Sequence, residues 1–336
     1  MKLASYNDGS RDGRLLVVSK NLKYFVNVDD VAPTMQFAID NWNNVSIKLK
    51  KIYEKLNANT IHRKPFDEQL VHSPLPRAFQ WLDASAYVNH VSLVRKARNA
   101  EMPESFWTDP LMYQGGSDDF IPPRSPIVLS DENWGIDFEA EIAIIINDVD
   151  MGSSSDKVED KILLIMLAND VSLRNLVPNE ISKGFGFIHS KPSTAFSPVA
   201  VTLDEIKPFW KNGKLLRTIN TTLNDKAIGK VDADKDMTFN FYELIAHASK
   251  SRNLRAGTII GSGTISNRSD DGGPGKTINM GGRGYSCIAE LRMVEEIKTG
   301  SPKTPFMKFG DKVSIGVLDN NKNSIFGTIK QTVIKK

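Results

Sequence analysis

The stretch Gly135-Ile-Asp-Phe-Glu-Ala-Glu-Ile-Ala-Ile-Ile-Ile146 predicts a β-strand, because it is dense in apolar residues and β-branched at its end. Side chains alternate between the two faces of a strand, so Asp137, Glu139 and Glu141 share one face. The other face carries Phe138, Ala140 and isoleucines. Acidic side chains two residues apart in so apolar a setting repel one another and resist desolvation. Water on an exposed edge or a divalent cation could relieve this repulsion, and the segment alone leaves both open.

The composition around this stretch is that of an ordinary globular protein. The chain has 336 residues, a length that predicts about two domains. A net charge of +3, from 43 basic and 40 acidic residues, is too balanced to indicate a nucleic-acid partner. The single cysteine, Cys287, excludes an internal disulfide framework and fits a reducing compartment. With no apolar signal-peptide core and no run of about 18 apolar residues, we expect a cytoplasmic protein without a membrane partner.

Proline and turn-forming residues interrupt the helix and strand patterns near residue 72 and predict a domain boundary there. We expect a small N-terminal αβ domain over residues 1–72 and a larger β-rich domain over 73–336. In the first, Leu15–Ser19 and Leu22–Asn27 predict a hairpin, and Thr34–Ala58 has helical periodicity with a candidate break at Asn43-Asn44. The segment Ser73–Ala78 contains two prolines and predicts an extended linker.

The second domain alternates strand and helix patterns. Helices are expected over Asp83–Asn99 and Phe241–Lys250. Leu163–Ala168 reads as a buried strand or the end of a helix, and it delivers Asn169 and Asp170 at its polar end. Further strands are expected in Phe196–Val201, Gly257–Ser266, Ser286–Leu291 and Lys312–Val317.

Several familiar catalytic motifs are absent. The chain has no G-x-S-x-G elbow and no G-x-G-x-x-G after a strand, and Gly272–Thr277 lacks the first glycine of a phosphate loop because residue 270 is Asp. The five histidines form no pair at zinc spacing. What remains is an oxygen-rich set, Asp83, Glu139, Glu141 and Asp170, of the kind that Mg²⁺, Ca²⁺ or Mn²⁺ prefers. A lone aspartate at the end of an apolar segment, such as Asp170, is more often a cap or turn residue.

Four segments resemble the fumarylacetoacetate hydrolase family. They are Asp83-Ala-Ser-Ala-Tyr-Val-Asn-His90, Phe138-Glu-Ala-Glu141, Asn169-Asp-Val-Ser-Leu-Arg174 and Gly263-Thr-Ile-Ser266. The resemblance runs in order from about residue 75 to the end, and more weakly before it. The spacing of Asp83 and His90 and the extra N-terminal domain are similar to the fumarylacetoacetase branch. The resemblance implies a mainly β fold with some α: a small N-terminal αβ domain and a C-terminal mixed β-roll or sandwich.

The resemblance also implies roles for individual residues. Asp83, Glu139, Glu141 and Asp170 would bind a divalent cation, Mg²⁺ foremost with Ca²⁺ or Mn²⁺ as alternatives. His90 would take a proton from water, and Glu290 would orient it. Arg174 and Lys191 would stabilise negative charge, and Tyr113 and Thr264 would contact a small-molecule substrate. A homodimer is implied as well.

The implied activity is metal-dependent hydrolysis of a carbon–carbon bond in a β-diketone acid. The substrate would be fumarylacetoacetate or a related acylpyruvate from the catabolism of aromatic compounds. Decarboxylation, enol–keto isomerisation or hydration of a 2-oxo acid are alternatives within the superfamily. A non-catalytic protein whose cation only braces the fold is an alternative of another class.

Two positions depart from the family pattern. Val177 stands where the family has glutamine, and Ser85 stands where animal members have tyrosine. Valine cannot hydrogen-bond a carboxylate, so this position favours a relative of fumarylacetoacetate over that compound and leaves the exact substrate open. A basic residue of Val94-Arg-Lys-Ala-Arg98 is a candidate replacement for a family arginine that meets a substrate carboxylate.

Overall fold

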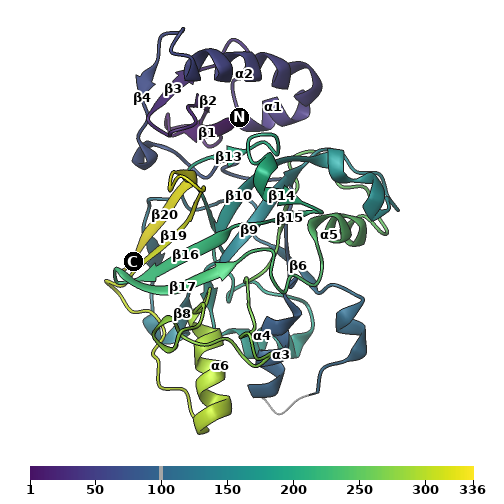
Figure 1. Ribbon diagram of the computed structural model, residues 1–336, viewed down its shortest axis with the longest axis vertical. Coiled ribbons are helices and arrows are strands. Elements are labelled where there is room, and N and C mark those ends of the chain that lie inside the picture. Colours follow the sequence, from purple (N-terminus) through teal and green to yellow (C-terminus); the bar gives the residue numbers. More distant parts are fainter. Residues whose placement is uncertain (98–100) are drawn as a thin grey trace.

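The computed structural model describes residues 1–97 and 101–336, and the chain folds around two β-sheets (Figure 1). The larger sheet has the order β4 (Lys64–Pro65), β3 (Tyr24–Asn27), β2 (Arg14–Val18), β1 (Lys2–Tyr6), β13 (Ala200–Val201), β10 (Ile162–Asn169), β9 (Ala140–Ile146), β18 (Ile259–Gly261), β5 (Trp81–Ala84), β6 (Met112–Gly115), with β12 (Ala195–Phe196) beside β10. The smaller sheet has the order β17 (Lys226–Asp232), β16 (Thr218–Leu223), β19 (Lys312–Leu318), β20 (Ser324–Lys335), β7 (Ile127–Leu129). Two short pairs are β8 (Ile136–Asp137) with β11 (Ser172–Leu173), and β14 (Trp210–Lys211) with β15 (Lys214–Leu215).

Strand β9 separates the two largest hydrophobic clusters of the described residues. Its even-numbered residues from Ala140 to Ile146 join a cluster with Ile219 of β16 and Ile315 of β19, so this cluster fills the space between the sheets. Ala143 and Ile145 point to the opposite face, where they share a second cluster with the N-terminal helices. The two sheets pack face to face and bury one face of β9 between them. The predicted fold class, mainly β with some α and a mixed sandwich, is confirmed.

The N-terminal strands extend the large sheet, because β1 pairs antiparallel with β13. The predicted hairpin is β2 with β3. The predicted helix is two helices, α1 (Met35–Asp40) and α2 (Trp42–Asn57), which meet at Asn41 rather than at Asn43-Asn44. Both lie over the N-terminal strands in Figure 1. The domain boundary at residue 72 stays a prediction.

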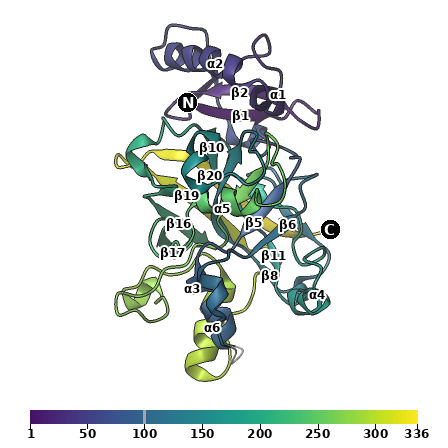
Figure 2. The same ribbon diagram turned by 90° about the vertical axis from the view of Figure 1, so that its right-hand side faces the viewer.

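Four further helices are α3 (Val88–Ala97), α4 (Val177–Lys183), α5 (Phe241–Ala248) and α6 (Ile288–Thr299). Short 3₁₀ turns span Glu68–Leu70, Glu104–Trp107, Glu132–Trp134, Ser155–Lys157, Glu159–Lys161, Lys207–Phe209 and Ile278–Met280. Helices α3 and α6 lie side by side at the end remote from the N-terminal domain (Figure 2). Within the described ranges, no helix has the length and apolar character needed to cross a bilayer.

Several element predictions are wrong. The single strands expected over Gly135–Ile146 and Phe196–Val201 are each two strands, β8 with β9 and β12 with β13. The helix expected over Asp83–Asn99 begins only at Val88, because Asp83 belongs to β5, which is held between β18 and β6. The expected end of that helix, residues 98 and 99, lies outside the described residues. The strand expected over Ser286–Leu291 is instead the start of α6. The carboxylate of Asp137 accepts the backbone N–H groups of Ile288 (2.8 Å) and Ala289 (2.9 Å), and such an acceptor stabilises a helix N-terminus.

Candidate metal and substrate site

The four acids of the oxygen-rich set meet at the ends of neighbouring strands. Asp83 lies in β5 and Glu141 in β9, while Asp170 directly follows β10 and Glu139 directly precedes β9. Strand β18 separates β5 from β9, and its Gly261 pairs with Asp83. A Cβ atom at Gly261 would lie 2.5 Å from Asp83 Oδ1, so a glycine leaves room for this carboxylate. Ligand atoms of all four acids lie within 4.8 Å of one another, and all four residues are buried.

The arrangement fits a divalent cation. Both carboxylate oxygens of Glu141 are buried and receive no hydrogen bond from the described residues. Burial and the neighbouring Asp170 raise the pKa of Asp83, and burial and Asp83 raise the pKa of Glu141. Buried carboxylates without a partner are costly, and oxygen-rich sites of this kind suit Mg²⁺, Ca²⁺ or Mn²⁺.

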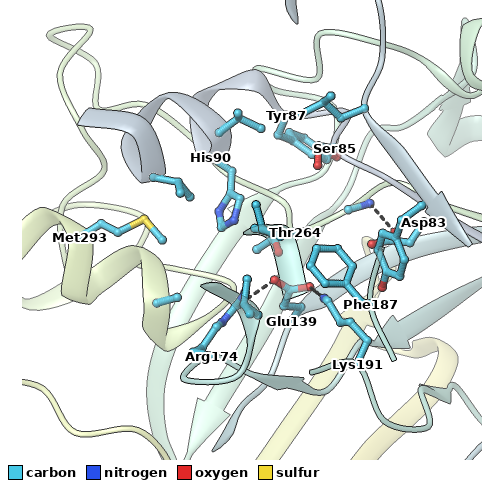
Figure 3. A pocket seen from close by; sticks show the side chains of 18 of the residues that line it. Asp83, Ser85, Tyr87, His90, Glu139, Arg174, Phe187, Lys191, Thr264 and Met293 are labelled. Carbon is cyan, nitrogen blue, oxygen red and sulfur yellow. Dashed lines mark hydrogen bonds and ion pairs between the residues drawn. The ribbon is translucent and has the colours of Figure 1, made fainter. Parts of the chain in front are cut away.

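Two cations already contact the cluster (Figure 3). Arg174 donates to Asp137 (2.9 Å) and Glu139 (2.6 Å), and Lys191 donates to Glu139 (2.7 Å) and Asp170 (2.6 Å). Burial alone would raise the pKa of Glu139, but Arg174 and Lys191 lower it below its usual range. Glu139 therefore stays ionised, whereas burial and the neighbouring acids oppose the ionisation of Asp83 and Glu141.

Tyr113 and Thr264, the two residues predicted to contact substrate, line the same cavity, and their contact with a substrate stays a prediction. The hydroxyl of Tyr113 donates to Asp170 Oδ2 (2.6 Å), and Thr194 donates to the other oxygen of the same carboxylate (2.6 Å). Thr264 lines the cavity beside Gly263, whose backbone N–H donates to Asp83 Oδ1 (3.1 Å). The two predicted contact residues thus border the acidic cluster.

His90 and Glu290 face one another across α3 and α6. Nδ1 of His90 lies 3.6 Å from Glu290 Oε1. Glu290 in turn accepts a hydrogen bond from Ser266, whose hydroxyl accepts one from Asn89 (2.6 Å). This chain of contacts fixes the carboxylate of Glu290 on the Nδ1 side of the imidazole. Figure 3 shows the ring of His90 turned toward Thr264.

A cavity of about 480 Å³ joins these groups. Seven of the ten predicted site residues line it: Asp83, His90, Tyr113, Glu139, Arg174, Lys191 and Thr264. Glu141, Asp170 and Glu290 do not line it, but each lies beside a residue that does. Val177 and Ser85, the two departures from the family pattern, also line the cavity.

Four supporting residues were not predicted as site residues. Asp137 anchors Arg174, Thr194 anchors Asp170, and Ser266 anchors Glu290. Glu180 accepts the backbone N–H groups of Ile188 (3.1 Å), His189 (2.8 Å) and Ser190 (3.0 Å), and so holds the chain that leads to Lys191. Asp137 and Ser266 stand within the motifs quoted above, whereas Thr194 and Glu180 carry no local signal.

Comparison with known proteins agrees with the resemblance. Residues 80–334 match the family model described as fumarylacetoacetate hydrolase C-terminal, and residues 1–77 match fumarylacetoacetase N-terminal domain 2. Fumarylacetoacetase of Caenorhabditis elegans is 25% identical over 228 residues, which cover 59% of this chain and 52% of that protein. The chain therefore spans about half the length of this relative.

Solved structures share the fold and carry different activities in their names. Maleylpyruvate hydrolase from Sphingobium sp. SYK-6 superposes with a TM-score of 0.66 at 16% identity, over 100% of both chains. Another structure of that hydrolase, with manganese(II) and pyruvate, has a TM-score of 0.64 at 16% identity and covers 100% of this chain and 99% of that one. A 5-carboxymethyl-2-hydroxymuconate delta-isomerase from Mycobacterium smegmatis has a TM-score of 0.51 at 18% identity, over 82% of this chain and 84% of that one.

At these identities the solved structures establish the fold and leave the reaction open. The family model covers most of the sequence, and its span contains every acid of the cluster. The chain belongs to the fumarylacetoacetate hydrolase family.

Proposed function

We propose that the protein hydrolyses a carbon–carbon bond in a β-diketone acid with the help of a divalent cation. The observation that carries this proposal is one cavity lined by Asp83 and Glu139 of the buried carboxylate cluster and by His90, which lies beside Glu290. Asp83, Glu139, Glu141 and Asp170 would hold the cation, with Mg²⁺ or Mn²⁺ as the first candidates. When bound, the cation supplies Lewis-acid polarisation of the substrate's carbonyl oxygens.

His90 is the proposed general base. With Glu290 on its Nδ1 side, the neutral ring keeps Nε2 free to take a proton from water, whose oxygen then attacks a substrate carbonyl carbon. The contact of 3.6 Å exceeds hydrogen-bond length, and catalytic hydrogen bonds commonly shorten only when substrate binds. The C–C bond breaks with its electron pair on the 2-oxo acid fragment, and the enolate so formed is protonated to a ketone. Lys191, which lies over the Tyr113 ring, and Arg174 supply positive charge at this end of the cavity.

An enol–keto isomerase is the second candidate, because a protein of the same fold carries an isomerase name. Isomerisation moves a proton and consumes no water, whereas hydrolysis incorporates one oxygen of water into the released acid. The experiment is turnover of acylpyruvates in ¹⁸O-labelled water with Mg²⁺ or Mn²⁺ added. Label in the released carboxylic acid supports hydrolysis, and loss of the enol absorbance without release of an acid contradicts it.

Replacement of His90 tests its role within that assay. His90→Ala should lower turnover about 10²–10⁴-fold, the usual value of general-base catalysis. Cation affinity, read by calorimetry, should change little because His90 is outside the carboxylate cluster. Near-native turnover would remove His90 from the reaction. The cytoplasmic location, the homodimer and a role in aromatic catabolism stay predictions.

A further inference from the structure

The cavity has two chemically different ends. Its polar end is formed by the acidic cluster with Arg174 and Lys191. Its other end lies among α3, α4, α6 and the chain that follows α6. Apart from the charged Arg292 and Glu296 of α6, the side chains there are mainly apolar: Val91, Val94, Val177, Ile181, Met293 and Phe306. In Figure 3, Met293, His90, Thr264 and Asp83 follow one another from left to right, so the proposed base lies between the two ends.

The apolar end is only partly covered by the protein itself. Ile181 is 51% exposed, and Val177 and Met293 are half-buried. Apolar side chains from three helices converge here on a concave surface continuous with the site. A ligand group that covers them removes apolar area from water, and each additional covered methylene strengthens binding about fourfold.

The lining cations of the described ranges already have other partners. Arg174 and Lys191 are each bonded to two acids. Arg292, the remaining lining cation, donates to the Thr304 carbonyl and lies 4.3 Å from the centre of the Phe306 ring. Glu296 lines the same end, so a carboxylate beside Arg292 would also face an acid.

The cation expected from the segment 94–98 is not supplied by its described residues. Arg95 donates to the Glu101 carbonyl (2.8 Å) and lies over the Phe106 ring, and it does not line the cavity. Lys96 is exposed and does not line it either. Arg98 lies outside the described residues.

We propose that the substrate has one carboxylate, at the polar end, and an apolar alkyl or aryl acyl arm that fills the end lined by Val177 and Met293. This inference rests on the proposed function for the identity of the polar head. An arm ending in a second carboxylate would be desolvated against apolar side chains and would have to draw Arg292 from its present partners, which opposes its binding. Val177 is then a specificity-determining residue.

Binding of 2-oxo acids that cannot be cleaved tests the arm independently of turnover. Calorimetry on the Mn²⁺-loaded full chain would compare 2-oxooctanoate with 2-oxosuberate, an equally long chain with a terminal carboxylate. We expect 2-oxooctanoate to bind at least about 100-fold more tightly than 2-oxosuberate. Shorter 2-oxo acids should bind about fourfold more weakly for each methylene that they lack. Equal affinities, or tighter binding of 2-oxosuberate, would overturn the proposal. If Arg98→Met then removed that binding of 2-oxosuberate, Arg98 would be the cation that refutes us.

A substitution at Val177 tests whether the apolar end causes the preference for 2-oxooctanoate over 2-oxosuberate. Val177→Arg should weaken the binding of 2-oxooctanoate and strengthen the binding of 2-oxosuberate. The ratio of their two affinities should therefore fall at least about tenfold. Ile47→Arg is the matched control, since Ile47 is 61% exposed on α2 and outside this cavity. An unchanged ratio in a folded Val177→Arg variant would overturn the assignment of Val177.

Turnover of acylpyruvates separates this inference from the proposed function. Cleavage with higher kcat/KM for hexanoylpyruvate than for its carboxylate-ended counterpart supports both. Cleavage without that preference overturns the inference alone. No cleavage of any acylpyruvate, with the preference for 2-oxooctanoate intact, overturns the proposed hydrolysis and leaves the apolar arm supported.

Discussion

Replacement of Glu141 by glutamine should have opposite effects on stability with and without a cation. Glu141 is buried with no hydrogen bond from a described residue to either carboxylate oxygen, and three other acids surround it. Like charges 4.8 Å apart repel by about 3–4 kcal/mol at an effective dielectric constant of about 20. A proton taken up by the cluster relieves part of this repulsion. We therefore expect Glu141→Gln to stabilise the cation-free protein by about 1–2 kcal/mol.

The same substitution removes an anionic ligand. Loss of groups that only support metal ligands typically costs 10–100-fold in affinity, so loss of a ligand should cost more than about 100-fold. A cation at 100 times its Kd stabilises the wild type by about 2.7 kcal/mol, and the variant should gain little at that concentration. The order of stabilities should thus reverse when Mg²⁺ or Mn²⁺ is added.

Thermal and denaturant unfolding in EDTA and in excess Mn²⁺ measure this reversal. Glu54→Gln, an exposed residue on α2, is the matched control and should change neither value. If Glu141→Gln destabilised the protein in EDTA, the buried carboxylate would have a partner that we have not recognised. If Mn²⁺ stabilised wild type and variant equally, the four acids would not be the binding site.

Three further predictions concern the supporting residues. Asp137→Asn should lower stability by about 1–2 kcal/mol in both EDTA and Mn²⁺, because Asp137 caps α6 and anchors Arg174; a gain in EDTA would show that it repels the cluster as Glu141 does. Burial opposes ionisation of Glu180, but hydrogen bonds from Ser190, His189 and Ile188 lower its pKa from 4.5 to about 2. The contribution of Glu180 to the free energy of unfolding is therefore complete above about pH 4.5 and is lost as the pH falls toward 2. The free energy of unfolding should fall less steeply with decreasing pH in Glu180→Gln than in the wild type, and identical slopes would contradict this. Ser266→Ala should lower kcat about tenfold, since Glu290 loses its hydrogen bond, with Mn²⁺ affinity unchanged and activity restored by Ser266→Thr; an equal loss in both variants would indicate a packing role instead.

Local pattern predicted the parts of the fold whose signal is contained in a few neighbouring residues. The alternation of β9 is visible in the sequence because each face of the strand meets a different core. The segment Ser286–Leu291 was misassigned because a short apolar run suits either a strand or a helix. The choice is made by the carboxylate of Asp137, about 150 residues earlier in the chain, which caps the helix. No window of local sequence contains that contact.

The candidate site shows the same limit. The residues of the acidic cluster stood out because acids at strand ends in an apolar setting are unusual, and the family resemblance grouped them. Thr194 and Glu180 were missed because their type is common in loops, and their role follows only from the carboxylate or the backbone that they meet. Arg174 was assigned to negative charge on the substrate, yet in the structure it is bonded to two protein carboxylates.

The way in which Asp137, Glu139 and Glu141 divide explains how one segment can carry three buried acids. They were expected on one face of a continuous strand, but regular pairing stops between β8 and β9, at Phe138 and Glu139. Asp137 is neutralised by Arg174 and the N-terminus of α6, and Glu139 by Arg174 and Lys191. Only Glu141 is left without a partner of opposite charge among the described residues. The repulsion is therefore concentrated on the acid that faces Asp83 and Asp170, which is where a bound cation would relieve it.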